Sequence, residues 1–386
     1  MSELIYLDNS ATSFPKPEPV YKFMDGFYRK HGVSPGRSGF DAAIETEEIV
    51  FETRKILCGL FNGDNPKRLT FSYNASDSLN MLIQGLTEKG DHVVTTTLEH
   101  NSVLRPLYHL SESGFIDVTH VHFDENGYVH PDDIKKAIRA NTKLVIVNHS
   151  SNVIGTIQPL KEIGKVCKKA GVYFVVDASQ SAGAVPIDVV DMGIDALAFT
   201  GHKCLMGPTG IGGSYVVKGL PVKSTRFGGT GVRSAQKNHL TKFPYRLECG
   251  TLNIVGVAGL LAGVKWILGK GMENLHKQEY MLYNKLRNGV NNIENVIAYC
   301  ANNTENQNPV LSLNIKGFDP GDVGMMLDVD YNIASRTGLQ CAPLVHVGLG
   351  TDKIHGTARL SIGPLNTEDH IDVALGAIRD IASIRK

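Results

Sequence analysis

The sequence predicts an α/β fold with a mostly parallel sheet in a large domain, followed by a smaller α+β domain. Between about residues 92 and 201, short β-branched runs alternate with amphipathic stretches, an order typical of a parallel sheet covered by helices on both faces. After about residue 255 long helical patterns take over. The length of 386 residues fits two or three domains.

The expected strands of the large domain are nearly continuous apolar runs, as a sheet buried on both faces requires. They are "HVVTTT" (92–97), "DVTHVHF" (117–123), "KLVIVNHS" (143–150), "VYFVVDAS" (172–179) and "DALAFTG" (195–201). Helical patterns at 132–139 and 160–170 separate some of these runs. Strands joined through helices are expected to lie parallel to one another.

The C-terminal part begins with the helical stretch "GVAGLLAGVKWILGKGM" and continues with a helix pattern near 274–293. Strands are expected at 309–317 and 357–363, and a closing helix at 368–384. We expect a large domain over residues 14–256 and a small domain made of residues 1–13 and 257–386.

The composition argues against several classes of partner. The chain has 39 basic and 39 acidic residues, so no net charge would attract nucleic acid or an anionic membrane. No run approaches the roughly 18 apolar residues of a membrane span, and the N-terminus lacks the pattern of a signal peptide. The sequence therefore predicts a cytoplasmic protein whose partners are small molecules and other proteins.

The six cysteines contain no CxxC pair, which argues against both a disulfide framework and a structural zinc site. No metal is expected. Most of the cysteines fit the role of small buried hydrophobic residues, so a reactive thiol must be identified from its neighbours. The six are Cys58, Cys167, Cys204, Cys249, Cys300 and Cys341.

Polar residues at the carboxyl ends of the expected strands point to a ligand site, because ligands bind at that edge of a doubly wound sheet. Asp177 ends one strand and Lys203 follows the next, with Gln180 three residues after Asp177. A carboxylate and a lysine in this arrangement fit pyridoxal phosphate, the lysine as its Schiff-base partner and the carboxylate on the ring nitrogen. The alternative is a structural ion pair or an exposed lysine.

Three further segments could contribute to such a site. Asn74, Ser76 and Asp77 precede a helix in an N-cap arrangement, and free N–H groups at a helix start bind phosphate. His100 and Asn152 follow later strands, and an imidazole there could stack on a planar cofactor or exchange protons with it. Taken alone, each signal also fits a purely structural residue.

Together these motifs resemble the class V aminotransferase family of fold-type I pyridoxal phosphate enzymes, and within it the cysteine desulfurase and selenocysteine lyase branch. The similarity covers nearly the whole chain, and "RTGLQCAP" looks like the SufS-like rather than the NifS/IscS-like group. The matching segments are "YLDNSATSFPKP", "EHNS", "SNVIGT", "VDASQSAG", "TGHKCLMGPTGIG", "FGGTGVRS", "LECGTLN" and "SRTGLQCAP". The resemblance implies a seven-stranded, mostly parallel sheet.

The resemblance implies that Lys203 binds the cofactor, Asp177 pairs with the pyridine nitrogen, Gln180 contacts the phenolic oxygen and His100 stacks on the ring. The residues that match phosphate-binding positions are Ser76, Asp77, Thr200 and His202. Thr251 matches a residue that the family contributes across a dimer interface, which implies a homodimer with shared sites.

The resemblance also implies the substrate groups. Arg359 matches the arginine that binds the α-carboxylate, a planar bidentate task suited to guanidinium, with Asn152 and Arg336 assisting. Cys341 matches the sulfur-accepting cysteine, whose alternative is an inert buried thiol, and Gly338 indicates a loop around it. Cys204 and Cys249 depart from the family's usual residues and are interpreted as packing residues.

The implied reaction releases sulfur from L-cysteine, or selenium from L-selenocysteine, to give L-alanine through a persulfide on Cys341. Acceptors consistent with it are an iron–sulfur scaffold, a carrier protein or a selenium-pathway enzyme. Two alternatives remain open at this point. One is a transaminase or another lyase with the same cofactor, and the other is a non-catalytic sulfur-relay protein.

Overall fold

The computed structural model describes residues 4–35, 40–300 and 306–384, and its large part is built around one seven-stranded sheet. The strand order is β2-β8-β7-β6-β5-β3-β4. The bounds are β2 Leu69–Ser72, β3 Asp91–Thr96, β4 Ile116–Val121, β5 Thr142–Asn148, β6 Tyr173–Asp177, β7 Ala196–Thr200 and β8 Gly212–Val216.

This sheet confirms the predicted fold class. Neighbours from β7 to β4 run parallel, and only β8 is antiparallel, to both β7 and β2. The five predicted strands correspond to β3 through β7, with ends displaced by one or two residues. Strands β2 and β8 were not predicted, because β8 begins with two glycines and β2 is only four residues long.

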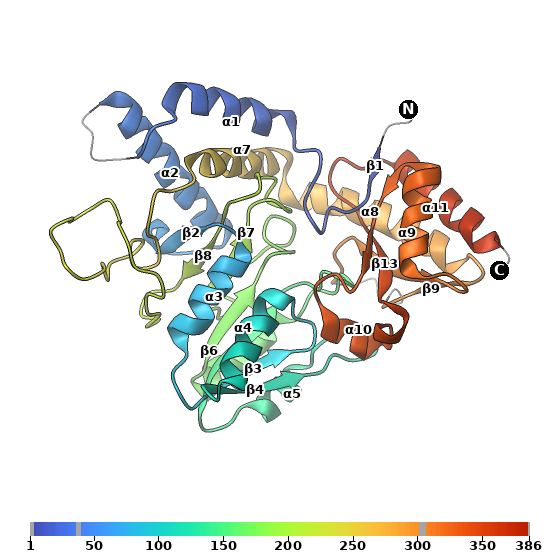
Figure 1. Cartoon of the computed structure of the whole chain (residues 1–386), viewed down its shortest axis with the longest axis horizontal. Coiled ribbons are helices and arrows are strands. Elements are labelled where there is room, and N and C mark those ends of the chain that lie inside the picture. The colour runs from blue at the N-terminus through green and yellow to red at the C-terminus, as the bar shows by residue number, and fades with distance from the viewer. Residues whose placement is uncertain (1–3, 36–39, 301–305, 385–386) are drawn as a thin grey trace.

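Both faces of the sheet are buried, which explains the continuous apolar runs. Val145 packs in one hydrophobic core, together with Leu57 of α2 and Ile163 of α6. The next residue, Ile146, packs in a second core with Leu82 of α3. Successive side chains of a strand point to opposite faces, so each strand residue needs an apolar side chain. Helices α3 and α4 lie in front of the sheet in Figure 1.

The helices of the large part are α1 Glu18–His31, α2 Asp41–Leu60, α3 Ala75–Leu86, α4 Asn101–Glu112, α5 Pro131–Ala137, α6 Leu160–Ala170 and α7 Ile254–Lys270, with a 3₁₀ turn at Pro66–Arg68. Helix α7 lies beside α1 and α2 (Figure 1). The prediction of α6 is confirmed at both ends.

The C-terminal part holds a four-stranded antiparallel sheet in the order β12-β13-β10-β9. Its strands are β9 Val296–Ala298, β10 Val310–Ile315, β12 Arg336–Gly338 and β13 Thr357–Ser361. Its helices are α8 Met272–Asn291, α9 Pro320–Tyr331, α10 Pro343–Leu349 and α11 Glu368–Ser383, with a 3₁₀ turn at Asp352–Ile354. The α+β character predicted for this part is confirmed.

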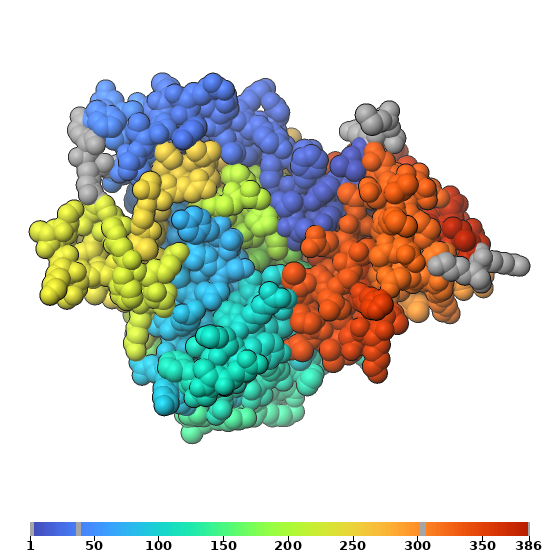
Figure 2. Space-filling view, viewed as in Figure 1, coloured from blue at the N-terminus to red at the C-terminus, as the bar shows by residue number. Residues whose placement is uncertain are grey.

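The N-terminal segment joins the two parts. Strand β1 (Ile5–Tyr6) pairs with β11 (Ile333–Ala334), and Leu7 packs in the core of the small sheet. Figure 2 shows this dark blue segment between the large body and the orange C-terminal part. Leu260 of α7, by contrast, packs in the large core. The domain boundaries themselves stay a prediction.

Within the described ranges, no single helix is long and apolar enough to cross a membrane; α7 and α8 reach such a length and composition only as a pair bent by 80°.

Candidate functional site

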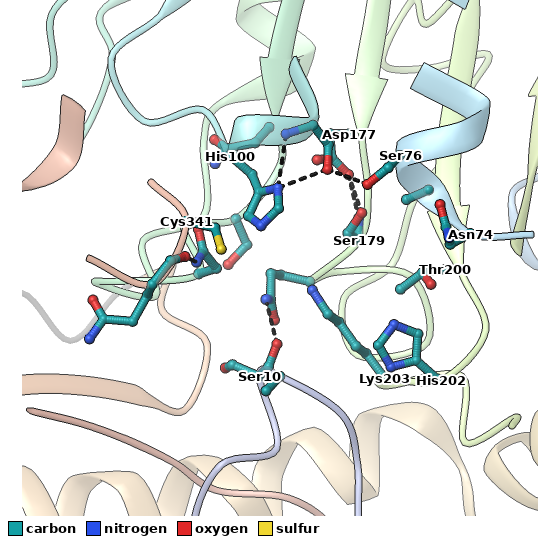
Figure 3. A pocket seen from close by; sticks show the side chains of 18 of the residues that line it. Ser10, Asn74, Ser76, His100, Asp177, Ser179, Thr200, His202, Lys203 and Cys341 are labelled. Carbon is teal, nitrogen blue, oxygen red and sulfur yellow. Dashed lines mark hydrogen bonds between the residues drawn. The ribbon is translucent and has the colours of Figure 1, made fainter. Parts of the chain in front are cut away.

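A cavity of about 320 Å³ opens at the carboxyl edge of the large sheet, between the two parts of the chain. Most of the residues singled out from the sequence line it together, and Figure 3 shows several of them converging on one hollow. The predicted residues that line it are Asn74, Ser76, His100, Asn152, Asp177, Gln180, Thr200, His202, Lys203, Arg336, Cys341 and Arg359.

Two neighbouring strand ends place a carboxylate and an amine in this cavity. Asp177 is the last residue of β6, and Lys203 follows β7, which runs parallel to β6. The Oδ1 atom of Asp177 accepts hydrogen bonds from the Ser179 backbone N–H at 2.9 Å and from the Ser179 hydroxyl, whereas Oδ2 accepts none from the residues that the structure describes. Burial lowers the pKa of Lys203, and the Asp177 charge opposes that shift only in part.

His100 caps the N-terminus of α4 and presents one ring nitrogen to the cavity. Its Nδ1 accepts the Ser102 backbone N–H at 3.0 Å, so the neutral ring carries its proton on Nε2. Burial, reinforced by the positive charge of Lys203, lowers the pKa of His100 to about 4. The imidazole is therefore neutral at physiological pH.

One end of the cavity offers groups that suit an anion. Asn74 caps α3 by accepting the Asp77 backbone N–H at 2.9 Å, while Ser76 lines the cavity from the first turn of the same helix. The Oγ1 of Thr200 and the Nδ1 of His202 are buried without a hydrogen-bond partner among the described residues. Buried polar atoms of this kind ordinarily bind a partner, so a ligand is expected there.

Arg359 of β13 offers a second positively charged group that suits an anion. Its Nη2 donates to Asp8 Oδ1 at 2.6 Å and its Nη1 donates to the Asn152 backbone oxygen at 2.7 Å. The side chain is only 2% exposed, and its Nε is without a partner in the described part of the chain. Burial lowers the pKa of Arg359, while Asp8 opposes this shift, so the guanidinium remains charged.

Cys341 lies at the far side of the cavity from Asn74, Thr200 and His202 (Figure 3). Its side chain is exposed, in contrast to the buried Cys58 and Cys167. The sequence left open that Cys341 is an inert buried thiol, and its exposed side chain is not consistent with that alternative.

Two predicted residues lie elsewhere. Asp77 points away from the cavity lining and pairs with Arg226, both carboxylate oxygens lying 3.0 Å from Nη1. Thr251 is exposed and lines a separate hollow next to the buried Arg54–Glu248 ion pair. Neither residue touches the cavity within this one chain.

Several lining residues were not singled out from the sequence. Ser179 could have been, because it follows Asp177 by two residues, a spacing at which short polar side chains bond locally. Asp8 carried no local signal, since it is 351 residues from its partner Arg359. The lining residues missed in this way are Ser10, Ser102, Asn148, Ser150, Ser179 and Gln340.

The sequence model of the family Aminotransferase class-V matches residues 5–373. The chain belongs to the class-V aminotransferase family. This membership agrees with the strand-end lysine and aspartate and with the mostly parallel sheet.

Relatives that match nearly the whole chain are named cysteine desulfurases. A probable cysteine desulfurase of Pyrococcus abyssi is 35% identical, covering 98% of this chain and 94% of the relative. One from Methanothermobacter thermautotrophicus is 34% identical, covering 98% and 95%. The apo structure of a cysteine desulfurase from Thermococcus onnurineus NA1 superimposes with a TM-score of 0.92 at 35% identity, covering 98% of this chain and 94% of that one. The SufS-like assignment within the family stays a prediction.

Proposed function

We propose that this protein is a pyridoxal phosphate-dependent cysteine desulfurase that releases L-alanine from L-cysteine and leaves the sulfur on Cys341. One observation carries the proposal: an exposed cysteine shares a single cavity with a strand-end lysine and a buried arginine. Relatives named cysteine desulfurase that match nearly the whole chain support the same reaction.

The cavity residues fit the proposed cofactor. The unpartnered Thr200 hydroxyl and His202 imidazole, with Ser76 at the start of α3, would hold the phosphate. Asp177 would face the ring nitrogen with its free oxygen, Gln180 would contact the phenolic oxygen and His100 would stack on the ring. Lys203 would hold the cofactor covalently. Bound there, pyridoxal phosphate supplies an electron sink for the pair left when the substrate loses its Cα proton.

Lys203 and Arg359 would have separate roles: Arg359 would bind the amino acid substrate, and Lys203 would accept its Cα proton. The charged guanidinium of Arg359, fixed by Asp8 and the Asn152 carbonyl, binds the α-carboxylate and orients the substrate. Arg336 lines the same end of the cavity and assists it. Because burial lowers its pKa, Lys203 gives up its own proton more readily than an exposed lysine, and the resulting amine would accept the Cα proton.

Cys341 would take the sulfur. Its thiolate attacks the substrate sulfur, so that a new S–S bond forms while the substrate's C–S bond breaks. The electron pair of the broken bond stays on the carbon skeleton, which takes up protons and leaves as L-alanine. Thiol and L-cysteine thus become persulfide and L-alanine with no further oxidant. L-Selenocysteine would give L-alanine as well, with less need of Cys341: its weaker C–Se bond would break with the electron pair left on the carbon skeleton, and selenium would leave at the elemental oxidation level.

The proposal extends to partners. A cofactor role for Thr251 would require a second copy of the chain, because this residue lies outside the cavity of its own subunit. We therefore expect a homodimer. The exposed position of Cys341 supports transfer of the sulfur to an acceptor protein, with iron–sulfur cluster assembly as one destination. A cytoplasmic location remains part of the proposal.

Alanine release from L-cysteine tests this function, with Cys341→Ala measured beside the wild type. We expect alanine from the wild type and a loss of at least about 100-fold in the variant, since the nucleophile is gone. The yellow chromophore of the bound cofactor should be equal in both proteins. Full cysteine turnover by the variant would contradict the persulfide step. Amino transfer to a keto acid without sulfur release would favour a transaminase instead.

A further inference from the structure

The backbone at Cys341 and at the residue before it is held in an unusual conformation. Gln340 and Cys341 have φ angles of 41° and 57°, in the left-handed region that residues with a Cβ seldom adopt. The Gln340 carbonyl accepts from Asn152 Nδ2 and the Cys341 carbonyl from the Asn101 backbone N–H, both at 2.7 Å. Two consecutive residues remain in this region only where their surroundings fix them.

The side chain of Gln340 extends this anchoring through a directed series of hydrogen bonds. It is buried, and its Nε2 donates to the Thr357 carbonyl at 2.8 Å. Its Oε1 lies 2.8 Å from His346 Nε2, and an amide oxygen can only accept, so His346 carries its proton there. The other ring nitrogen of His346 then accepts from the Thr351 hydroxyl at 2.8 Å.

The hydrogen-bond series requires a neutral His346 side chain, and the buried position of His346 favours that state. Its side chain is completely buried, and burial lowers its pKa to about 4. Each side-chain nitrogen and oxygen of Thr351, His346 and Gln340 thus has at least one hydrogen-bond partner among the described residues, which makes a buried polar network rigid.

The series ends on the strand that binds the substrate. Thr357 and Arg359 both belong to β13, and the Arg359 side chain in turn contacts the Asn152 backbone. Gln340, the residue next to the sulfur nucleophile, is thus connected with the strand that carries the carboxylate-binding arginine. Such a connection fixes the separation between the two groups that must act on one amino acid.

We propose that Gln340 is a positioning residue that holds Cys341 where its thiolate can reach the substrate sulfur. The inference rests on the proposed desulfurase function. Gln340 does not itself act on the reacting atoms, and its effect passes through the backbone of Cys341. A displacement of about 1 Å at a reacting atom can cost on the order of 100-fold in rate, so loss of this anchor should be visible in the chemical step.

The experiment compares Gln340→Met with the wild type, both loaded with pyridoxal phosphate. Methionine keeps the length of the side chain and removes its hydrogen bonds. Four quantities are measured: kcat for L-cysteine, KM for L-cysteine, the single-turnover rate of Cys341 persulfide formation by trapping and mass spectrometry, and the absorbance of bound cofactor. Gln278→Met, an exposed change on α8, is the matched control.

We expect Gln340→Met to lower kcat and the persulfide rate together by about tenfold or more, with KM within about threefold and cofactor absorbance unchanged. The control should match the wild type. A persulfide rate within twofold of wild type, or a loss that only follows reduced cofactor binding, would overturn the inference. If Gln340→Met does not fold, Thr351→Val is judged by the same criteria, because it removes one donor of the series.

The wild type separates the two levels of the proposal. A wild-type protein that forms neither alanine nor persulfide from L-cysteine overturns the proposed function itself. A wild type that forms both, beside a Gln340→Met variant that forms them equally fast, overturns the role of Gln340 alone.

Discussion

The two ends of the cavity are built in different ways. At the end that we assign to the cofactor, Asp177 and Lys203 follow adjacent parallel strands, and the sheet alone brings them together. At the sulfur end, Cys341 sits on a loop whose position depends on Asn101 and Asn152, both distant in sequence, and on β13. The first end is a consequence of strand order, and the second depends on packing between the two parts of the chain.

This difference predicts how substitutions at each end of the cavity change the turnover of L-cysteine and of L-selenocysteine. Groups at the cofactor end should serve every amino acid that the protein processes, because they act on the bonds at Cα. Groups at the sulfur end should matter only where the leaving group must be captured by a thiol. The predictions below begin with the largest expected effect.

Lys203→Ala should abolish turnover of both L-cysteine and L-selenocysteine, by roughly 10³-fold or more, because the variant lacks both the base and the covalent anchor. Cys341→Ala should abolish only the cysteine reaction. Alanine release from the two substrates by the two variants measures this contrast. Equal losses on both substrates in both variants would show that the ends do not act separately.

Arg359→Lys should raise KM for L-cysteine by about 10- to 100-fold, since an ammonium cannot replace a planar guanidinium that bonds Asp8, the Asn152 carbonyl and a carboxylate together. Steady-state kinetics give the value. Arg336→Lys is the matched control, because this second arginine is exposed and should shift KM far less. A larger effect in the control would assign the carboxylate to Arg336.

The different construction of the two ends of the cavity also explains which site residues could be predicted from the sequence. Asp177, Lys203 and His100 were found because strand ends can be located from apolar runs, and parallel strands end at one edge. The family resemblance added Cys341 and Arg359, which no local pattern marks. The pairing of Asp8 with Arg359 was not found, because the two residues are 351 positions apart. The Gln340 hydrogen-bond series joins residues at most 17 positions apart, but only the folded loop shows which of them meet. Strand β8 was missed because it begins with two glycines.

For Thr251 and Asp77, the predicted role in the site differs from the position in the structure. Both were assigned to the cofactor by resemblance, yet neither lines the cavity of this chain. Asp77 instead pairs with Arg226, and Thr251 faces a separate hollow. A residue contributed from a second subunit cannot be recognised from the fold of one chain, so the role of Thr251 depends on the proposed dimer.

Glu99, beneath the cofactor end, should give the smallest effect on activity. Its Oε1 accepts from the Thr96 hydroxyl at 2.7 Å and the Asn148 backbone N–H at 3.0 Å, and burial raises its pKa to about 8. The carboxyl is therefore mostly protonated at pH 7, and Glu99→Gln replaces one neutral group by another. Cysteine turnover at pH 7 should stay within about twofold of wild type.

The protonation of Glu99 should be visible in the unfolding free energy of the protein rather than in its activity. In the unfolded chain Glu99 loses its proton near its ordinary pKa, whereas the folded protein retains it up to about pH 8. The unfolding free energy of the wild type should thus fall as pH rises from about 4.5 to 8, by an amount on the order of a few kcal/mol, and level off above. Glu99→Gln lacks this pH-dependent contribution. Urea unfolding should therefore show that the unfolding free energy of the variant rises relative to that of the wild type between pH 5 and 8. A constant difference across that range would mean that Glu99 is ionised in the fold, and that the cofactor end carries a second negative charge beside Asp177.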